Sequence, residues 1–416
     1  MKMASGDRSS LVTRQFLIRC LRTWLAAERA PALSGPIEGE VDWKSLLQLA
    51  EFHRVTPLLF RFLRRARPQP APESLLMEMG AYVRSAARRS LALTGELLRL
   101  VEGLEAHGIT PIPIKGPALA FFLYGDAALR QFGDLDILVR QQDLAAAKEL
   151  LLSRGYQPEY QLTRRQEEAW HHNYHHLFSL RRRDGTIVVE LHRDIMPSGS
   201  PFHGDLDGIW RRRKRLAVAG ATVASLSTED LLLFLCVHGS KHSWRRLQWL
   251  CDVAQLISCH TVDWGQVTAQ ANSSSGQQML FLGLFLADDI LGTPIPRELE
   301  QIIARNPQTK RFAGLVKSQL FEGSLFPSIL PQCNVVYIQM QAGERMRDRV
   351  VFWPRFWLRT VTSPTPAEWN IMPLPDLLFP LYYVIRPVRL AGKYALKVAD
   401  LLRAWFTRRW RSVIAR

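Results

Sequence analysis

Apolar residues in the first quarter of the chain recur at steps of three and four, without the alternation that favours strands. This pattern extends from Val12 to His107 and is typical of amphipathic helices. The last helical block ends at His107–Gly108, where glycine is the usual left-handed terminator of a helix. We therefore predict a helical N-terminal region over residues 1–107.

A different pattern begins after Gly108. The short apolar run Ile109–Ile114 contains two prolines, which suits an irregular or edge strand because proline cannot donate to a central ladder. Pro117 stands where proline favours the start of a helix, and Gly125 ends the apolar segment that follows. The alternation in Gly133–Val139 then predicts a strand.

A helix and a hairpin are expected next. The helix covers Leu144–Leu152, and the hairpin joins His176–Leu180 to Thr186–His192 through Asp184–Gly185, a strong turn signal. These elements predict an α+β core with a small mixed sheet over residues 108–222.

Helical periodicity returns at Ser227, where Asp230 three residues later resembles a capping box. The apolar segment Leu231–Leu256 predicts one helix or a pair of helices. We expect a helical domain over residues 223–330 and a basic, tryptophan-rich helical region over residues 331–416. The predicted fold class is thus α+β, with helical regions on both sides of the core.

Charge narrows the choice of partners. The 416 residues include 54 lysines and arginines against 38 aspartates and glutamates, a formal net charge of +16. With 47% hydrophobic and 22% charged residues, the chain is not a disordered or collagen-like protein. A polyanionic partner is expected, namely nucleic acid, a nucleoside triphosphate or an acidic membrane face, with arginine-rich interfaces as the alternative.

The cysteines and apolar runs predict a cytoplasmic protein. The five cysteines are scattered and show no metal-binding spacing, so we expect buried, reduced thiols rather than disulfides or a zinc site (Cys20, Cys236, Cys251, Cys259 and Cys333). Arginines interrupt every candidate secretory signal near the N-terminus. No apolar run approaches the roughly 20 residues of a membrane-spanning helix, so we predict no membrane span.

Three carboxylates form the candidate metal site. Asp134 and Asp136 are two residues apart on a strand, so both face the same side, about 6 to 7 Å apart. Glu190 lies on a later strand that pairs beside the first in our prediction. Oxygen ligands of this kind suit Mg²⁺, and two ions would clamp the attacking and leaving oxygens of a phosphoryl displacement.

The candidate phosphate site lies at the start of a helix. Lys115 and Gly116 bring an ammonium group and exposed backbone amides to the positive end of the helix dipole. The guanidinium of Arg130 suits a phosphate as well. Together these parts describe transfer of a nucleotidyl group, with pyrophosphate as the leaving group.

Several histidines leave two interpretations open. His192 shares the face of Glu190 and either orients that carboxylate, contacts substrate or is structural. His238 and His242 are one helical turn apart but lack the glutamate of a zinc protease, so they and Lys241 either line the nucleotide or acceptor pocket or pack on the core. Four more histidines lie close together before the predicted hairpin, and such a group is more typical of a polar surface than of a metal site (His171, His172, His175 and His176). His176 is the one nearest the hairpin.

The C-terminal tail is strongly basic. Residues 386–416 carry nine lysines and arginines, one acid, Asp400, and the tryptophans Trp405 and Trp410. Such a segment suits an anionic membrane surface. Nucleic acid is a less favoured partner for the same charges, and a helix packed on its own domain is the remaining alternative.

These residues together resemble a known family, the uncharacterised nucleotidyltransferase-like proteins of bacteria, within the DNA polymerase β-like nucleotidyltransferase superfamily. The resemblance covers roughly residues 41–257 and rests on the following positions: Leu49–Leu59, Lys115–Gly116, Leu119, Tyr124, Arg130, Gly133–Val139, Glu190–His192, His238, Lys241, His242, Trp244 and Asp252. It implies a mixed-sheet catalytic core, Asp134, Asp136 and Glu190 as metal ligands, and magnesium-dependent use of a nucleoside triphosphate. It implies no particular acceptor.

The sequence thus predicts a cytoplasmic, metal-dependent nucleotidyltransferase that acts on a hydroxyl, phosphate or amine of a small molecule, sugar or peptide. A catalytically inactive protein of the same fold, which binds a nucleotide or lies against the inner face of the membrane, is the alternative.

Overall fold

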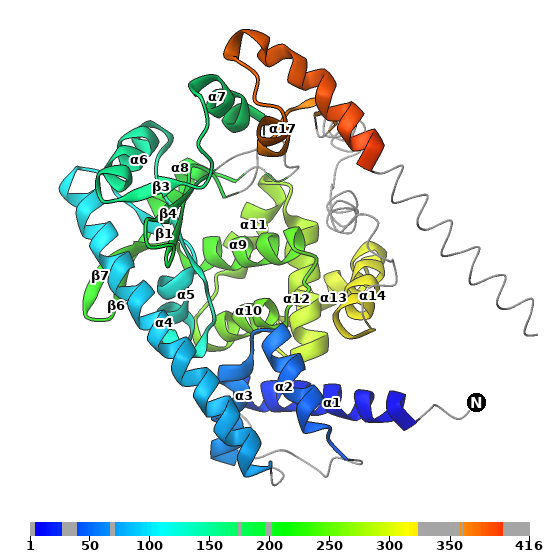
Figure 1. Ribbon diagram of the computed structural model, residues 1–416. Helices are drawn as coiled ribbons and strands as arrows, with labels where there is room; N and C mark the ends of the chain where they lie inside the picture. The colour runs from blue at the N-terminus through cyan, green and yellow to red at the C-terminus, as the bar shows by residue number, and fades with distance from the viewer. Residues whose placement is uncertain are drawn as a thin grey trace, which may run out of the picture.

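Figure 1 shows the computed structural model of the chain. The structure describes residues 5–26, 40–66, 71–173, 177–195, 202, 204–322, 354, 358–359 and 361–393.

Helices form the N-terminal region, as predicted. They are α1 (Ser5–Leu25), α2 (Trp43–Phe52), α3 (Thr56–Ala66) and α4 (Glu73–Ala106). Gly108 follows α4 in the left-handed conformation, with φ of 74°, which confirms the predicted helix end. The 34 residues of α4 carry the chain from the N-terminal helices to the sheet (Figure 1).

The central sheet has five strands in the order β1-β2-β5-β4-β3. The strands are β1 (Ile112–Pro113), β2 (Asp134–Leu138), β3 (Tyr156–Pro158), β4 (Leu177–Arg182) and β5 (Val188–His192). Only β2 and β5 pair in parallel, and the other pairs are antiparallel. The α+β class with a small mixed sheet is therefore confirmed, and the proline-containing strand β1 lies at a sheet edge as expected.

Local signals explain most of the connections. Helix α5 (Gly116–Tyr124) ends at Gly125, whose φ is 66°, and α6 (Leu144–Ser153) starts after Asp143, although the Asp143 side chain forms no capping hydrogen bond. β4 and β5 form the predicted hairpin, with the Asp184 carboxylate accepting from the Thr186 amide at 2.9 Å. Strand β3 and the hairpin of β6 (Lys214–Val218) and β7 (Ala221–Ser225) had no sequence prediction.

Helix α7 (Arg164–Asn173) lies between β3 and β4, and the chain after the sheet is mainly helical. The helices there, up to residue 322, are α8 (Leu206–Arg212), α9 (Thr228–Lys241), α10 (Leu247–Cys259), α11 (Trp264–Ser273), α12 (Gln277–Leu291), α13 (Arg297–Ala304) and α14 (Pro307–Glu322). Ser227 caps α9 by accepting from the Asp230 amide at 3.1 Å. The Asp230 carboxylate accepts from the Ser227 hydroxyl instead of closing a capping box. The predicted apolar segment is a helix pair, α9 and α10.

Buried apolar residues form three cores. The first joins the N-terminal helices α1–α3 to α9–α14, and the second lies between the sheet and the helices α4 and α6. The third is small and contains Trp369, Phe379 and Tyr382, from α17 (Pro366–Ile371), η3 (Asp376–Leu381) and the helix that follows. The predicted domain boundaries after residues 107, 222 and 330 stay a prediction.

Two sequence expectations concern cysteines and membranes. Cys20, Cys236 and Cys251 are free and buried as predicted, but Cys259 is exposed at the end of α10, so the prediction of burial is wrong for this thiol. Cys333 lies outside the described residues. In the part of the chain that the structure describes, no helix is both long enough and apolar enough to cross a bilayer.

Candidate active site

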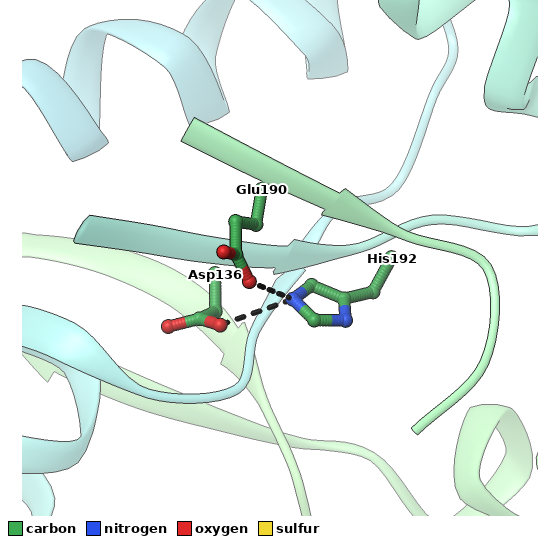
Figure 2. Close-up of side chains that lie close together, drawn as sticks. All are labelled: Asp136, Glu190 and His192. Atoms are coloured by element: carbon green, nitrogen blue, oxygen red, sulfur yellow. Dashed lines mark hydrogen bonds and ion pairs between the residues drawn. The ribbon is translucent and has the colours of Figure 1, made fainter. Parts of the chain in front are cut away.

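The site is built where β2 and β5 lie side by side. Their parallel register pairs Asp136 with Glu190 and Leu138 with His192. Because residues two apart on a strand face the same side, Asp134 and Asp136 share a face of β2, and Glu190 and His192 share a face of β5. The two strands therefore present acidic and imidazole groups to one space (Figure 2).

Asp136, Glu190 and His192 meet in a tight cluster, here called the triad. His192 Nε2 lies 3.0 Å from Asp136 Oδ1 and 3.4 Å from Glu190 Oε2. One donor atom from each residue lies within 4.8 Å of the other two. The sequence interpretation in which His192 orients Glu190 agrees with these contacts, and the structure adds its contact with Asp136.

Lys115 supplies a positive charge to the triad. It occupies the N-cap position of α5, and its Nζ lies 2.6 Å from Asp136 Oδ1. Burial by itself would lower the pKa of Lys115, but the charge of Asp136 and their hydrogen bond outweigh burial and raise the pKa. Lys115 is therefore held as a cation at the point predicted to contact phosphate.

Asp136 is ionised although it is almost fully buried, at 2% exposure. Burial would raise its pKa, but the charge of Lys115 and the hydrogen bond with His192 hold the pKa far below the usual range. The second oxygen, Oδ2, is buried and has no hydrogen-bond partner among the described residues. An unpartnered buried oxygen of a carboxylate is costly, and a bound cation would satisfy it.

Asp134 lies at the same end of the sheet but outside the triad. Burial and the like charges of Asp136 and Glu190 raise its pKa, against the opposing effect of Lys115. A cation bound nearby would favour its ionised form. Asp134 is thus electrostatically coupled to the site.

Gly116 brings the start of α5 against β2. Its φ is 63°, and a Cβ added there would lie 3.3 Å from the backbone oxygen of Asp134. A residue without a side chain is therefore needed for both the left-handed conformation and the close approach. This explains the predicted Lys115–Gly116 turn in physical terms.

The C-terminal end of α9 brings more positive charge near the triad. The pKa of Lys241 is lowered to about 8 by burial and then by the charge of Lys115, whereas Glu190 and Asp136 act in the opposite direction. The Lys241 ammonium has no hydrogen-bonded or ion-paired partner among the described residues. A largely buried ammonium near acidic groups, without a direct partner, is suited to binding an anion.

His238 and His242 pack with an aromatic residue beside Lys241. Their ring centroids are 4.6 Å apart, and each lies within 6 Å of the Trp249 ring, at 5.7 and 5.3 Å. Burial, followed by Lys241, lowers the pKa of His242 to about 3. Burial, followed by Lys115, lowers that of His238. Both rings are therefore neutral at physiological pH, which favours their packing and leaves Lys241 as the cation of this helix end.

Arg130 has a different partner from the predicted phosphate. Its Nε donates to both carboxylate oxygens of Asp252 in α10 at 3.1 Å, and Tyr124 donates to the same carboxylate at 3.1 Å. Arg130 is 6% exposed and Asp252 fully buried. The motif residues Tyr124, Arg130 and Asp252 thus form one buried network between α5, the segment before β2, and α10.

Arg54 is a basic residue near the site that sequence reasoning did not single out. It lies in the turn between α2 and α3 with φ of 56°, and its charge lowers the pKa of Asp134. The sequence signal was only its place in the N-terminal helical motif, since a left-handed arginine cannot be read from residue type. The side chains of His171 and His172, and all of His175 and His176, lie outside the described residues.

The residues present fit a divalent cation. The carboxylates of Asp136 and Glu190 and the imidazole of His192 place donor atoms within 4.8 Å of one another, and Asp136 Oδ2 has no partner among the described residues, so they form a suitable donor set. Carboxylate oxygens favour Mg²⁺ or Mn²⁺, and an imidazole nitrogen is acceptable to Mn²⁺ and later transition metals.

Comparisons with known proteins identify the family. A family model described as an uncharacterised nucleotidyltransferase matches residues 39–292, more than half of the chain. Among solved structures, the chain is similar to an antigenic nucleotidyltransferase-like protein from Paracoccidioides brasiliensis, with 19% identity over 49% of this chain and 93% of that chain and a TM-score of 0.32. No curated protein gave a significant match. The range matched by the family model contains Lys115, the triad and Lys241.

Proposed function

Because the chain belongs to the family of uncharacterised nucleotidyltransferases, we propose that it transfers a nucleoside monophosphate from a nucleoside triphosphate to a hydroxyl, phosphate or amine acceptor. The acceptor is a small molecule, a sugar or a peptide. The observation that carries the proposal is the ionised, buried Asp136, with one oxygen unpartnered, beside Glu190 and the cation Lys115.

The triad would hold the divalent cation, with Asp134 beside it. We favour Mg²⁺, with two ions, as the resident metal. When bound, the metal neutralises phosphate charge and polarises the phosphorus that is attacked. This role is supported by the unpartnered Asp136 Oδ2 and by the donor atoms within 4.8 Å of one another.

Two lysines are proposed to bind the phosphate oxygens. Lys115, at the start of α5, and Lys241, at the end of α9, act on the same acidic groups, and both are suited to bind the triphosphate. The start of α5, opened by Gly116, adds the positive end of a helix dipole. While no cation is bound, His192 keeps Asp136 and Glu190 in place through its two contacts. His242 is proposed to line the nucleotide pocket beside Lys241.

The reaction is proposed to take place in the cytoplasm, where nucleoside triphosphates are supplied. An anionic membrane surface is a further proposed partner, through the basic C-terminal region, and nucleic acid is the less favoured polyanion. Residues 394–416 of that region lie outside the described residues.

The test combines binding and turnover on the full chain. Thermal unfolding is followed with Mg²⁺ or Mn²⁺ and a panel of nucleoside triphosphates, and pyrophosphate release is then measured with candidate acceptors. We expect metal and nucleotide together to raise the Tm, because a ligand at 100 times its Kd adds about 2.7 kcal/mol. Glu190→Gln and Asp136→Asn should each lower turnover at least a hundredfold.

Asp207→Asn is the matched control, because Asp207 is an exposed aspartate on α8. It should behave as the wild type. Glu190 is more exposed than Asp136, so its variant keeps the test valid if Asp136→Asn unfolds. Tight nucleotide binding without turnover across the acceptor panel would instead support the inactive nucleotide-binding protein.

A further inference from the structure

The helix at residues 382–393 has an inner face fixed to the body of the protein. Tyr382 is fully buried and Arg386 is 7% exposed. Arg386 and Arg389 form ion pairs with the buried Glu368 at 3.1 and 2.5 Å. These contacts determine which side of the helix faces the protein.

The preceding segment is attached to α7 as well. Thr163 donates to the Asp376 carboxylate at 2.8 Å, and Arg165 donates to the Asp376 carbonyl at 2.9 Å. The Arg165 guanidinium lies 5.5 Å from the Phe379 ring centroid. The two attachments, to Glu368 and to α7, hold η3 and the helix in one orientation.

The opposite face is apolar and exposed. Leu377, Leu381, Val384 and Val388, here called the outer stripe, are 85%, 47%, 63% and 68% exposed. Val384 and Val388 are four residues apart on the helix, on the side away from Tyr382. Leu377 and Leu381 belong to η3, which directly precedes it. In Figure 1 this orange-red helix lies at the periphery of the molecule, beyond α7 and α17. A row of large aliphatic side chains kept in water is unfavourable and marks an interaction surface.

The charge that follows this helix identifies the partner. Residues 394–416 contain six lysines and arginines, one acid and two tryptophans in the sequence, within a chain of net charge +16. Basic residues attract anionic headgroups, tryptophan favours the membrane interface, and an aliphatic stripe requires an apolar layer. Nucleic acid satisfies the charges but offers nothing to the aliphatic side chains.

We propose that the outer stripe docks on an anionic lipid bilayer, with the helix lying in the plane of the interface. This inference assigns a defined face to the proposed membrane partner, and it is independent of the chemistry at the triad. The stripe uses no residue of the active site.

The test is flotation of the full chain with vesicles of phosphatidylcholine alone or mixed with phosphatidylglycerol. The wild type should float with the mixed vesicles and remain unbound with the neutral ones. Val384→Asp/Val388→Asp should lower partitioning at least tenfold. Leu91→Asp, at a site 71% exposed on α4, is the matched control and should float as the wild type does.

A second variant separates charge from the stripe. Arg408→Gln/Arg409→Gln/Arg411→Gln should lower partitioning into the mixed vesicles and make it less dependent on salt concentration, because each basic residue near the surface contributes about fivefold. Circular dichroism and metal-dependent nucleotide binding should be unchanged in the stripe variant, which distinguishes failure of docking from failure of the proposed function.

Three results would overturn the proposal. They are a wild type that does not float with anionic vesicles, a stripe variant that floats as well as Leu91→Asp, and a stripe variant that loses self-association in light scattering while its flotation is retained. The last result would assign the stripe to a second copy of the chain.

Discussion

At the scale of single residues, burial lowers the pKa of Lys241 into the range in which its charge changes near neutral pH. Its ammonium lies near Lys115, Glu190 and Asp136, without a direct partner among the described residues, and its pKa is lowered from 10.5 to about 8. Because the unfolded chain keeps its proton up to about 10.5, the free energy of unfolding should rise with pH between about 8 and 10.5 through this group. The same titration removes the positive charge that the proposed triphosphate site uses.

We expect affinity for a nonhydrolysable triphosphate, measured without divalent metal, to fall as pH rises through about 8. Lys241→Gln should weaken binding at pH 7 about tenfold, the usual worth of a charged hydrogen bond, and should lose this pH dependence. Lys241→Arg should move the fall to higher pH, because arginine stays protonated. Fluorescence titration from pH 7 to 9.5 is the measurement. Parallel profiles for the wild type and Lys241→Gln would contradict the role of Lys241.

At the scale of elements, the junction between α5 and β2 sets the position of Lys115 relative to Asp136. Two glycines bound α5, and both have positive φ, 63° at Gly116 and 66° at Gly125. Only Gly116 approaches another element, since a Cβ there would lie 3.3 Å from the Asp134 carbonyl oxygen, whereas a Cβ at Gly125 meets nothing within 4 Å. Substitutions at the two glycines therefore distinguish the effect of backbone strain, which both share, from the effect of displacing α5, which only Gly116 has.

Gly116→Ala and Gly125→Ala should each cost about 1 to 2 kcal/mol for the left-handed backbone. Gly116→Ala should in addition push α5 from β2 and lower the proposed metal-dependent turnover at least tenfold, whereas Gly125→Ala keeps turnover near that of the wild type. Urea unfolding and pyrophosphate release measure the two effects. Equal turnover in both variants would show that the close approach at Gly116 is unimportant for the site.

At the scale of the whole molecule, one buried ion pair connects the sheet region to the helical core. Arg130 precedes β2, and Asp252 belongs to α10, whose apolar side chains lie in the core shared with the N-terminal helices. The pair is 3.0 Å long and almost completely buried. Removing one partner from such a pair leaves an uncompensated charge, which is far more costly than removing both.

Arg130→Met should therefore lower the free energy of unfolding by about 3 to 5 kcal/mol. Arg130→Met/Asp252→Asn should recover much of this loss, because asparagine is neutral and still accepts from Tyr124. Denaturant unfolding of both variants is the measurement, and a double variant no more stable than the single one would contradict the ion-pair explanation. Nucleotide affinity of the double variant tests the separate prediction that Arg130 contacts triphosphate.

Local patterns predicted much of the fold and part of the site. The helix ends at Gly108 and Gly125, the hairpin through Asp184–Gly185 and the shared face of Asp134 and Asp136 all depend on near neighbours in the chain, whose φ preferences and periodicity are properties of residue type. The short strand β3 and the hairpin of β6 and β7 escaped prediction, because strands of three to five residues carry little periodicity.

The sequence by itself determined which elements form and which acidic and basic groups they carry, because capping, turn chemistry and apolar periodicity act within a few residues. Only the tertiary structure decided that Glu190 pairs with Asp136, that Lys115 neutralises that carboxylate, and that Arg130 is held by Asp252, 122 residues away in the chain. Such partners depend on how whole elements pack against one another, because packing sets both the distance between two groups and their desolvation. Neither quantity can be predicted from neighbouring residues in the sequence.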